Sequence, residues 1–298
     1  MNGKSINLSV ALTLTFLLFV WWTPQKLSAQ NAAPNVSQIV REATENDQRA
    51  NYELISNYAY KIRRTTVKRN GESESSTYEI YFPSRLKREK STRGVAILVE
   101  KDGVPLKTKK IEESRRDAAE DLEKSGGESE EKSESLENRR AKGLTVNWQQ
   151  ANTAVGLWAF LKNCDFDKPQ QTAVDGREQI SLRFRNCRMD ELPAEHGYMG
   201  NLAGILYIDE VDKAVVRLEA WNKFIVNDGN SAPPKPALVF AQKNVAEGLW
   251  LPDLISVEGI GNENIFPKLK VNWKNELFDY KLSTTEVTDV EVGKPATR

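Results

Sequence analysis

The sequence predicts an α+β fold in which about ten antiparallel strands form a curled sheet, an incomplete β-barrel, with apolar helices on its concave face and a charged insertion. The stretch from Gly204 to Trp221 is the clearest evidence, because two apolar runs of strand length flank the polar turn Glu210–Lys213. On the second run, apolar and charged residues alternate from Val216 to Ala220, as in a strand buried on one side. The same alternation, with a period of two residues, recurs in the later part of the chain. The chain, with 298 residues, is long enough for one or two domains with a real core.

Residues 1–29 have the composition of a secretory signal peptide. The positive Lys4 precedes an apolar run from Leu8 to Trp22, and the small Ala29 stands at the expected cleavage point. The alternative is an uncleaved anchor helix, because the run approaches the ~20 residues that a membrane span needs. No cysteine follows the junction, so the mature chain is not expected to be lipid-modified itself. We therefore expect an exported protein that resides in the periplasm.

Export favours a disulfide between the two cysteines, Cys164 and Cys187, because an even count in an oxidising compartment favours pairing. The alternative is metal ligation, but the only histidine is His196, and Cys-Cys-His at this spacing matches no zinc pattern. We expect His196 to lie in a loop rather than to act as a general base, since no Ser or Cys nucleophile motif accompanies it. No metal or other cofactor is predicted.

Residues 30–106 are predicted to hold an N-terminal helix and the first strands of a single domain. Asn35 or Ser37 can cap an amphipathic helix. After it the apolar period changes to two, which predicts a long hairpin from Tyr58 to Phe82 that turns at Asn70-Gly71. Further strands are predicted at Leu86–Arg88 and Val95–Val99.

Residues 107–143 do not fit this pattern, because acidic and basic residues nearly balance and apolar residues are few. Gly126-Gly127 lies in the middle of the segment. Such a composition cannot bury a core, so we expect a solvated helical or flexible insertion. The functional alternative is a docking arm for a charged partner.

Residues 144–284 are predicted to complete the domain. Asn147–Lys162 is apolar around most of its circumference, which predicts a helix of about four turns that is covered on more than one side. Because Cys164 follows this segment, the disulfide would join the helix to the sheet. The remaining strands are predicted at Ile180–Phe184, Leu206–Asp209, Ala214–Asn222, Leu238–Val245, Leu249–Glu258, Phe266–Trp273 and Leu277–Leu282, with turns at Gly248 and Asn275-Glu276 and a tail at 285–298.

The order of these elements is itself informative. An export signal and an amphipathic helix precede the Tyr-rich hairpin of Asn57–Tyr60, then Gly204–Asp209 with Val215–Glu219, then Gly248–Pro252, which opens the next strand. This order resembles the family of periplasmic lipoprotein carriers and outer-membrane lipoprotein-sorting proteins over most of Val36 to Leu282. The chain departs from the carriers in its length and its charged insertion, and no single position matches their functional arginine.

The resemblance implies an exported, non-enzymatic carrier or sensor that binds lipid or lipoprotein acyl chains in an apolar concavity. One alternative is a cell-envelope interaction protein of the same fold, with an envelope protein partner and no lipid ligand. A hydrolase is the third alternative, disfavoured by the single histidine and the lack of a nucleophile motif. With 42 basic and 42 acidic residues, the chain has no net field to attract nucleic acid.

The residues expected to line such a concavity come from the predicted apolar helix and from the sheet. The alternative is that they are simply core, since apolar residues at strand and helix spacing pack in any such fold. They are Tyr58, Tyr60, Trp148, Val155, Trp158, Leu161, Phe184, Leu206, Leu218, Phe240 and Phe278.

Overall fold

The computed structural model describes part of the chain. The predicted signal peptide, the predicted tail and the predicted strand Leu86–Arg88 lie outside it. No helix in the described ranges combines the length and the apolar character that a membrane span requires. The described residues are 35–82, 95–126, 146–148, 153–174, 176–188, 194–224, 235–266 and 269–283.

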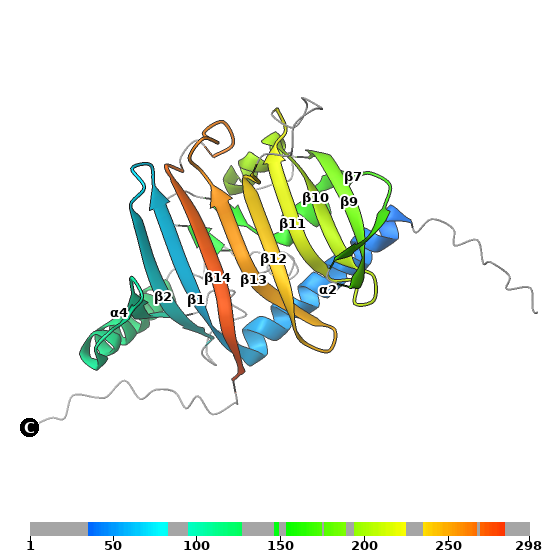
Figure 1. The fold of residues 1–298 in the computed structure, drawn as a ribbon. Helices are drawn as coiled ribbons and strands as arrows, with labels where there is room; N and C mark the ends of the chain where they lie inside the picture. The colour runs from blue at the N-terminus through cyan, green and yellow to red at the C-terminus, as the bar shows by residue number, and fades with distance from the viewer. Residues whose placement is uncertain are drawn as a thin grey trace, which may run out of the picture. The chain divides into compact units, whose positions relative to one another are not determined.

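Twelve strands form the main sheet. They are β1 (Tyr58–Lys68), β2 (Ser73–Tyr81), β3 (Val95–Lys101), β4 (Val104–Pro105), β7 (Cys164–Phe166), β8 (Gln170–Val174), β9 (Arg177–Cys187), β10 (Leu202–Asp209), β11 (Val215–Asn222), β12 (Leu238–Ala246), β13 (Leu249–Glu258) and β14 (Val271–Leu282). Their order is β4-β3-β2-β1-β14-β13-β12-β11-β10-β9-β7, with β8 also paired to β9 (Figure 1). Every pairing is antiparallel, and the strands at the two ends do not pair with each other. The protein is therefore an α+β incomplete β-barrel, as predicted.

Helix α2 (Val36–Asn57) runs along the inner face of the sheet, which we define as the face that carries the main core (Figure 1). The side chain of Asn35 caps the helix, because its Oδ1 accepts a hydrogen bond from the Ser37 amide at 3.0 Å. The helix ends where the apolar period changes to two, and Tyr58 begins β1. Its buried residues share one side at helical spacing: Ile39, Ala43, Asp47, Ala50 and Leu54.

The predicted helix Asn147–Lys162 is wrong in its first half. Strands β5 (Val146–Trp148) and β6 (Thr153–Val155) form a separate antiparallel pair, and helix α6 covers only Leu157–Asn163. The extended backbone of Gly156 separates the two structures, and the β-branched Thr153 and Val155 favour a strand. Within α6 every residue except Lys162 is buried, so the prediction of a helix covered on more than one side is confirmed there.

The predicted turn at Asn275-Glu276 is also wrong, because β14 passes through these residues as one continuous strand. Asn275 pairs with Arg64 of β1 on one side and with Ile255 of β13 on the other. Two neighbouring strands therefore override the local turn preference of Asn. The predicted strand Phe266–Trp273 is also wrong in its first part, since β14 begins only at Val271.

Helix α4 (Thr108–Gly126) occupies the first part of the charged segment and packs against β3 on the outer face of the sheet. The Leu98 amide donates a hydrogen bond to Ser114 Oγ at 2.8 Å. The apolar residues of α4 are few, as predicted, but Ile111 and Ala118 pack against the buried residues Val95 and Ile97. The helix is therefore not wholly solvated and covers a small second core.

Cys164 and Cys187 form the predicted disulfide, which joins β7 to β9 at directly opposite positions. Cys164 follows the last residue of α6, so the bond also fixes the end of this helix to the sheet. We expect the unfolded, unreduced protein to contain no free thiol, and Cys187→Ser to lower the free energy of unfolding by about 3 kcal/mol. Thiol titration in denaturant and urea unfolding measure the two effects. Two titratable thiols in the wild type would refute the pairing.

Asp209 organises the turn between β10 and β11. Its Oδ1 accepts hydrogen bonds from the amides of Val211 and Asp212 at 3.1 and 2.8 Å, and its Oδ2 accepts one from Arg177 Nε at 2.7 Å. This turn also positions α2, because the side chain of Asn46 donates to the Asp212 carbonyl at 2.6 Å. Burial disfavours the carboxylate of Asp209, but the Arg177 and backbone hydrogen bonds outweigh burial and lower its pKa.

We expect Asp209→Ala to lower the free energy of unfolding by about 2–3 kcal/mol at pH 7, because three charge-assisted hydrogen bonds are lost. A carboxyl with a lowered folded-state pKa stabilises the fold above its unfolded pKa of about 3.9 and loses this effect as the pH falls through the folded value. Urea unfolding should therefore show nearly the same difference from the wild type at pH 7 and pH 5 and a smaller difference at pH 3. Glu210→Ala, in the same turn, is the control, and an equal loss in both variants would contradict this role of Asp209.

Candidate functional site

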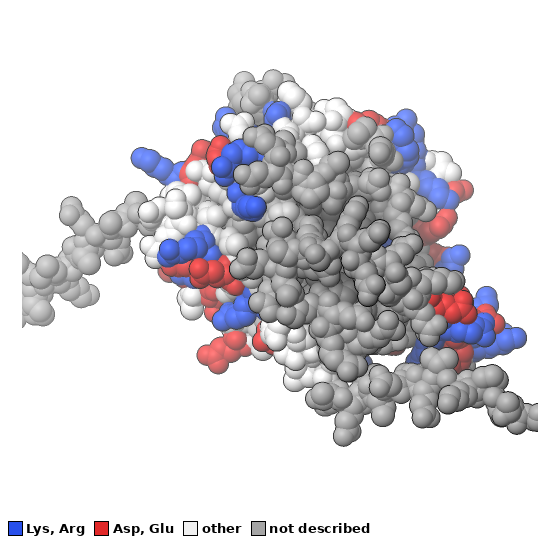
Figure 2. Space-filling model, turned by 180° about the vertical axis from the view of Figure 1, so that it is seen from behind, with Lys and Arg blue, Asp and Glu red and all other residues white. Residues whose placement is uncertain are grey.

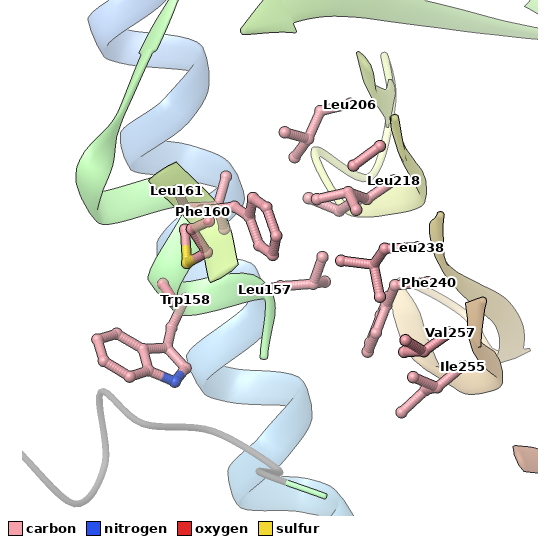
Figure 3. Packing of buried hydrophobic residues seen from close by; sticks show 14 of the residues in the cluster. Leu157, Trp158, Phe160, Leu161, Leu206, Leu218, Leu238, Phe240, Ile255 and Val257 are labelled. Carbon is pink, nitrogen blue, oxygen red and sulfur yellow. The ribbon is translucent and has the colours of Figure 1, made fainter. Parts of the chain in front are cut away.

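The candidate site is the inner face of the main sheet, where one cluster of buried side chains forms most of the described core. Side chains of α6 and of four strands point toward each other across this face (Figure 3). Leu157 and Phe160 come from α6. They oppose Leu206 and Leu218 of β10 and β11, Leu238 and Phe240 of β12, and Ile255 and Val257 of β13.

Most of the predicted lining residues lie in this cluster, and Tyr58 packs partly buried at its margin. None of these cluster members is more than 7% exposed, so all of them are shielded from solvent. Their contact with a ligand stays a prediction. The predicted lining residues that the structure brings into the cluster are Tyr60, Trp158, Leu161, Phe184, Leu206, Leu218 and Phe240.

Three predicted residues are not among the described members of this cluster, and Trp158, which is, has a different orientation. Trp158 is buried, but its ring points away from β10–β13, because it lies on the other side of α6 from Leu157 (Figure 3). Phe278 lies on the outer face of the sheet, since alternation along β14 places it opposite the buried Leu277. Trp148 and Val155 belong to β5 and β6, and their side chains lie outside the described part of the structure.

An aromatic group closes one end of the inner face. The rings of Tyr60 and Tyr280 stack at 5.4 Å, and Tyr58 meets Tyr280 edge-on at 6.3 Å. Burial raises the pKa of both Tyr60 and Tyr280, so their hydroxyls stay protonated. Sequence reasoning missed Tyr280, because a bulge at Asp279 changes the alternation of β14 and turns Tyr280 inward.

Two polar residues interrupt the apolar inner face at directly opposite positions of β1 and β14, Arg64 and Asn275. The guanidinium of Arg64 lies 5.6 Å from the ring centre of Tyr78, and burial lowers the pKa of this arginine. Asn275 is 0% exposed, and among the described residues neither its Oδ1 nor its Nδ2 has a hydrogen-bond partner. Sequence reasoning missed both residues. The period of β1 offered a signal for Arg64, which is in phase with Tyr60 and Ile62, whereas Asn275 resembled a turn residue.

The outer face carries two shallow hollows, of about 420 and 250 Å³. Both are lined by Arg63 and Phe278, and the Arg63 guanidinium lies 5.3 Å from the centre of the Phe278 ring. Acidic and basic side chains surround the hollows, including Glu276 and Lys274 in the larger and Glu79 and Lys61 in the smaller.

Charges of both signs alternate around the margin of the molecule on the side turned away from the viewer of Figure 1 (Figure 2). Within the described ranges, no three His, Cys, Asp or Glu side chains gather around a common point that would suit a metal ion. On the strands, the described site is mainly apolar surface with the polar residues Arg64 and Asn275, and α2 adds the buried carboxyl of Asp47.

Comparisons with known proteins give a weak likeness to solved structures. No family model matches the chain, and no curated protein matches it. A LolA superfamily protein from Nitrosomonas europaea is 11% identical, with 81% of this chain and 94% of that chain covered and a TM-score of 0.34. A candidate outer membrane lipoprotein-sorting protein domain from Vibrio parahaemolyticus is 7% identical, with 83% and 94% covered and a TM-score of 0.35.

A DUF1329 family protein from Desulfovibrio piger is 10% identical, with 83% of this chain and 94% of that chain covered and a TM-score of 0.36. Two of the three descriptions thus name the family that the sequence resembles. Because the identities and the TM-scores are this low, the likeness carries no argument about function.

Proposed function

We propose that the protein is an exported, non-enzymatic carrier or sensor that holds the acyl chains of lipids or lipoproteins against the inner face of its open sheet. The observation that carries the proposal is the largely apolar inner face of a sheet that does not close. Burial of apolar surface contributes about 25 cal/mol per Å², so an acyl chain needs only an apolar wall and few polar partners. This chemistry suits a binding protein.

The openness of the sheet supports a route for the ligand. In a closed barrel a chain can enter only at the ends, whereas here the inner face is covered in part by α2 and α6. Leu157 and Phe160 of α6 fill the space beside β10–β13 that an acyl chain would take (Figure 3). Because the disulfide holds the C-terminal end of α6, the ligand enters as the first turn of α6, with Leu157 and Phe160, shifts from the strands, and no strand pair has to break.

The predicted signal peptide and the disulfide Cys164–Cys187 support a periplasmic location, because the bond is stable in an oxidising compartment. The second candidate function is an interaction protein of the cell envelope that binds no lipid. The burial of the inner face by the chain itself favours it, since Leu206 and Leu218 are 0% exposed.

Titration of the purified mature protein with a fatty acid tests the proposal, with tryptophan fluorescence and calorimetry as readouts. We expect saturable binding. Phe278→Ala is the control variant, because it removes an aromatic ring from the outer face and should leave binding unchanged. If no acylated ligand binds saturably, the carrier function is refuted and the interaction protein remains.

A further inference from the structure

Asn275 is the most unusual polar group of the described core. On the inner face it is surrounded by apolar neighbours: Ile255 lies opposite on β13, and Trp273 and Leu277 precede and follow it on the same side of β14. These three residues are at most 2% exposed. A buried amide without partners is destabilising, because it loses its hydrogen bonds to water and gains none in return. An apolar side chain of similar size would suit the fold alone better.

The chemistry of this position defines a ligand. The Asn275 side chain offers two N–H donors and a carbonyl acceptor, and none of them is used by a described residue. Arg64 lies directly opposite on β1 and places a guanidinium on the same face. Its positive charge attracts electron-rich oxygen atoms of a ligand and repels cations. The carbonyl oxygen of an acyl head group suits both residues, since it can accept a hydrogen bond from Asn275 Nδ2 while the Arg64 guanidinium favours the partial or full negative charge on that oxygen.

We propose that Asn275, with Arg64 beside it, anchors the carbonyl head of an acyl ligand, either the amide of an acylated peptide or the carboxyl group of a fatty acid. The inference rests on the proposed function and adds to it a fixed position and orientation. The head lies between β1 and β14, and the chain extends along the inner face toward β13 and β12, where Ile255 and Phe240 continue the apolar surface.

Three probes of equal chain length test the anchor on the mature protein: N-methyldodecanamide, dodecanoic acid and 1-chlorododecane, each competing with a fluorescent naphthylamine probe. The wild type should bind at least one carbonyl probe about tenfold more tightly than the chloroalkane, the effect of one buried hydrogen bond. Preference for the amide identifies an acylated peptide as the ligand, and preference for the acid identifies a fatty acid. Asn275→Leu should abolish the preference.

Stability supplies the second readout. If the amide serves the ligand, Asn275→Leu should leave the midpoint of urea unfolding unchanged or raise it, while carbonyl binding weakens about tenfold. A Leu277→Met variant on the same side of β14 is the matched control, and it should change the binding of all three probes equally. A lower midpoint in Asn275→Leu would show that the amide has a structural role and would overturn the inference.

The failures of the two proposals are distinguishable. Equal binding of all three probes to the wild type, unaffected by Asn275→Leu, would refute the anchor and leave the carrier function intact. Absence of saturable binding for all three probes would refute the carrier function and the anchor with it.

Discussion

Phe184→Ala is expected to lower the free energy of unfolding by about 3–5 kcal/mol, because it removes a large side chain from the centre of the core. Phe184 is 1% exposed, and its ring centre lies 5.5 Å from that of Phe160 and 6.1 Å from that of Phe166. It thus joins α6 to β7 and β9. Gly204, opposite on β10, leaves room for the ring, since a Cβ there would lie 2.6 Å from Phe184 Cζ.

The matched control is Phe278→Ala, which removes the same ring from the outer face. Phe278 is only half-buried and contacts Arg63 by a cation–π interaction, so its loss should cost about 1 kcal/mol. Urea unfolding of the two variants measures the difference. Similar losses would mean that the two faces are buried to the same extent in solution, contrary to the structure.

Asp47→Asn is expected to stabilise the protein at pH 8 by a few kcal/mol and to leave it nearly unchanged at pH 4. Asp47 is on the buried side of α2, where burial raises its pKa from 3.8 to about 7 despite a hydrogen bond from Asn51. In the folded state the carboxyl therefore keeps a proton that the unfolded chain releases between pH 4 and pH 7. Its contribution to stability is present below pH 4 and is lost as the pH rises through 7.

Urea unfolding of the wild type and Asp47→Asn between pH 4 and pH 8 measures this dependence. Asparagine has the same shape but no charge, so the gap between the variants should widen as the pH rises. Glu45→Gln is the control, because Glu45 is exposed on the same helix and its loss should not change the pH profile of the wild type. Parallel profiles for wild type and Asp47→Asn would show that Asp47 is not buried as a neutral acid.

Patterns of period two predicted most of the sheet. The hairpin around Glu210–Lys213 and strands such as β13 follow directly from alternation, because each strand has one buried side. The pairing of β1 with β14 has no local signal, since it joins the first and last strands of the sheet. The predicted turn at Asn275 failed for the same reason, because the strands that flank this residue come from distant parts of the chain.

The candidate site was predicted only in its apolar part. Phe184, Leu206 and Leu218 were identified because apolar residues in phase on neighbouring strands must share a face. Asn275 and Tyr280 were missed. The burial of Asn275 depends on strands that pair with it from distant parts of the chain, and the inward orientation of Tyr280 depends on a bulge in β14. The helix expected at Asn147–Lys162 failed because apolar content alone does not distinguish a buried helix from a strand pair.

Photo-crosslinking with a fatty acid that carries a diazirine in its chain tests the central claim most directly, because it reports where the ligand lies. The mature protein is irradiated with the probe, digested and mapped by mass spectrometry, with excess unlabelled fatty acid as competitor. The account predicts competed crosslinks at inner-face positions of α6 and of β11–β13, such as Phe160, Leu218 and Ile255. Crosslinks confined to the outer face around Phe278, or crosslinks that competitor does not reduce, would contradict it.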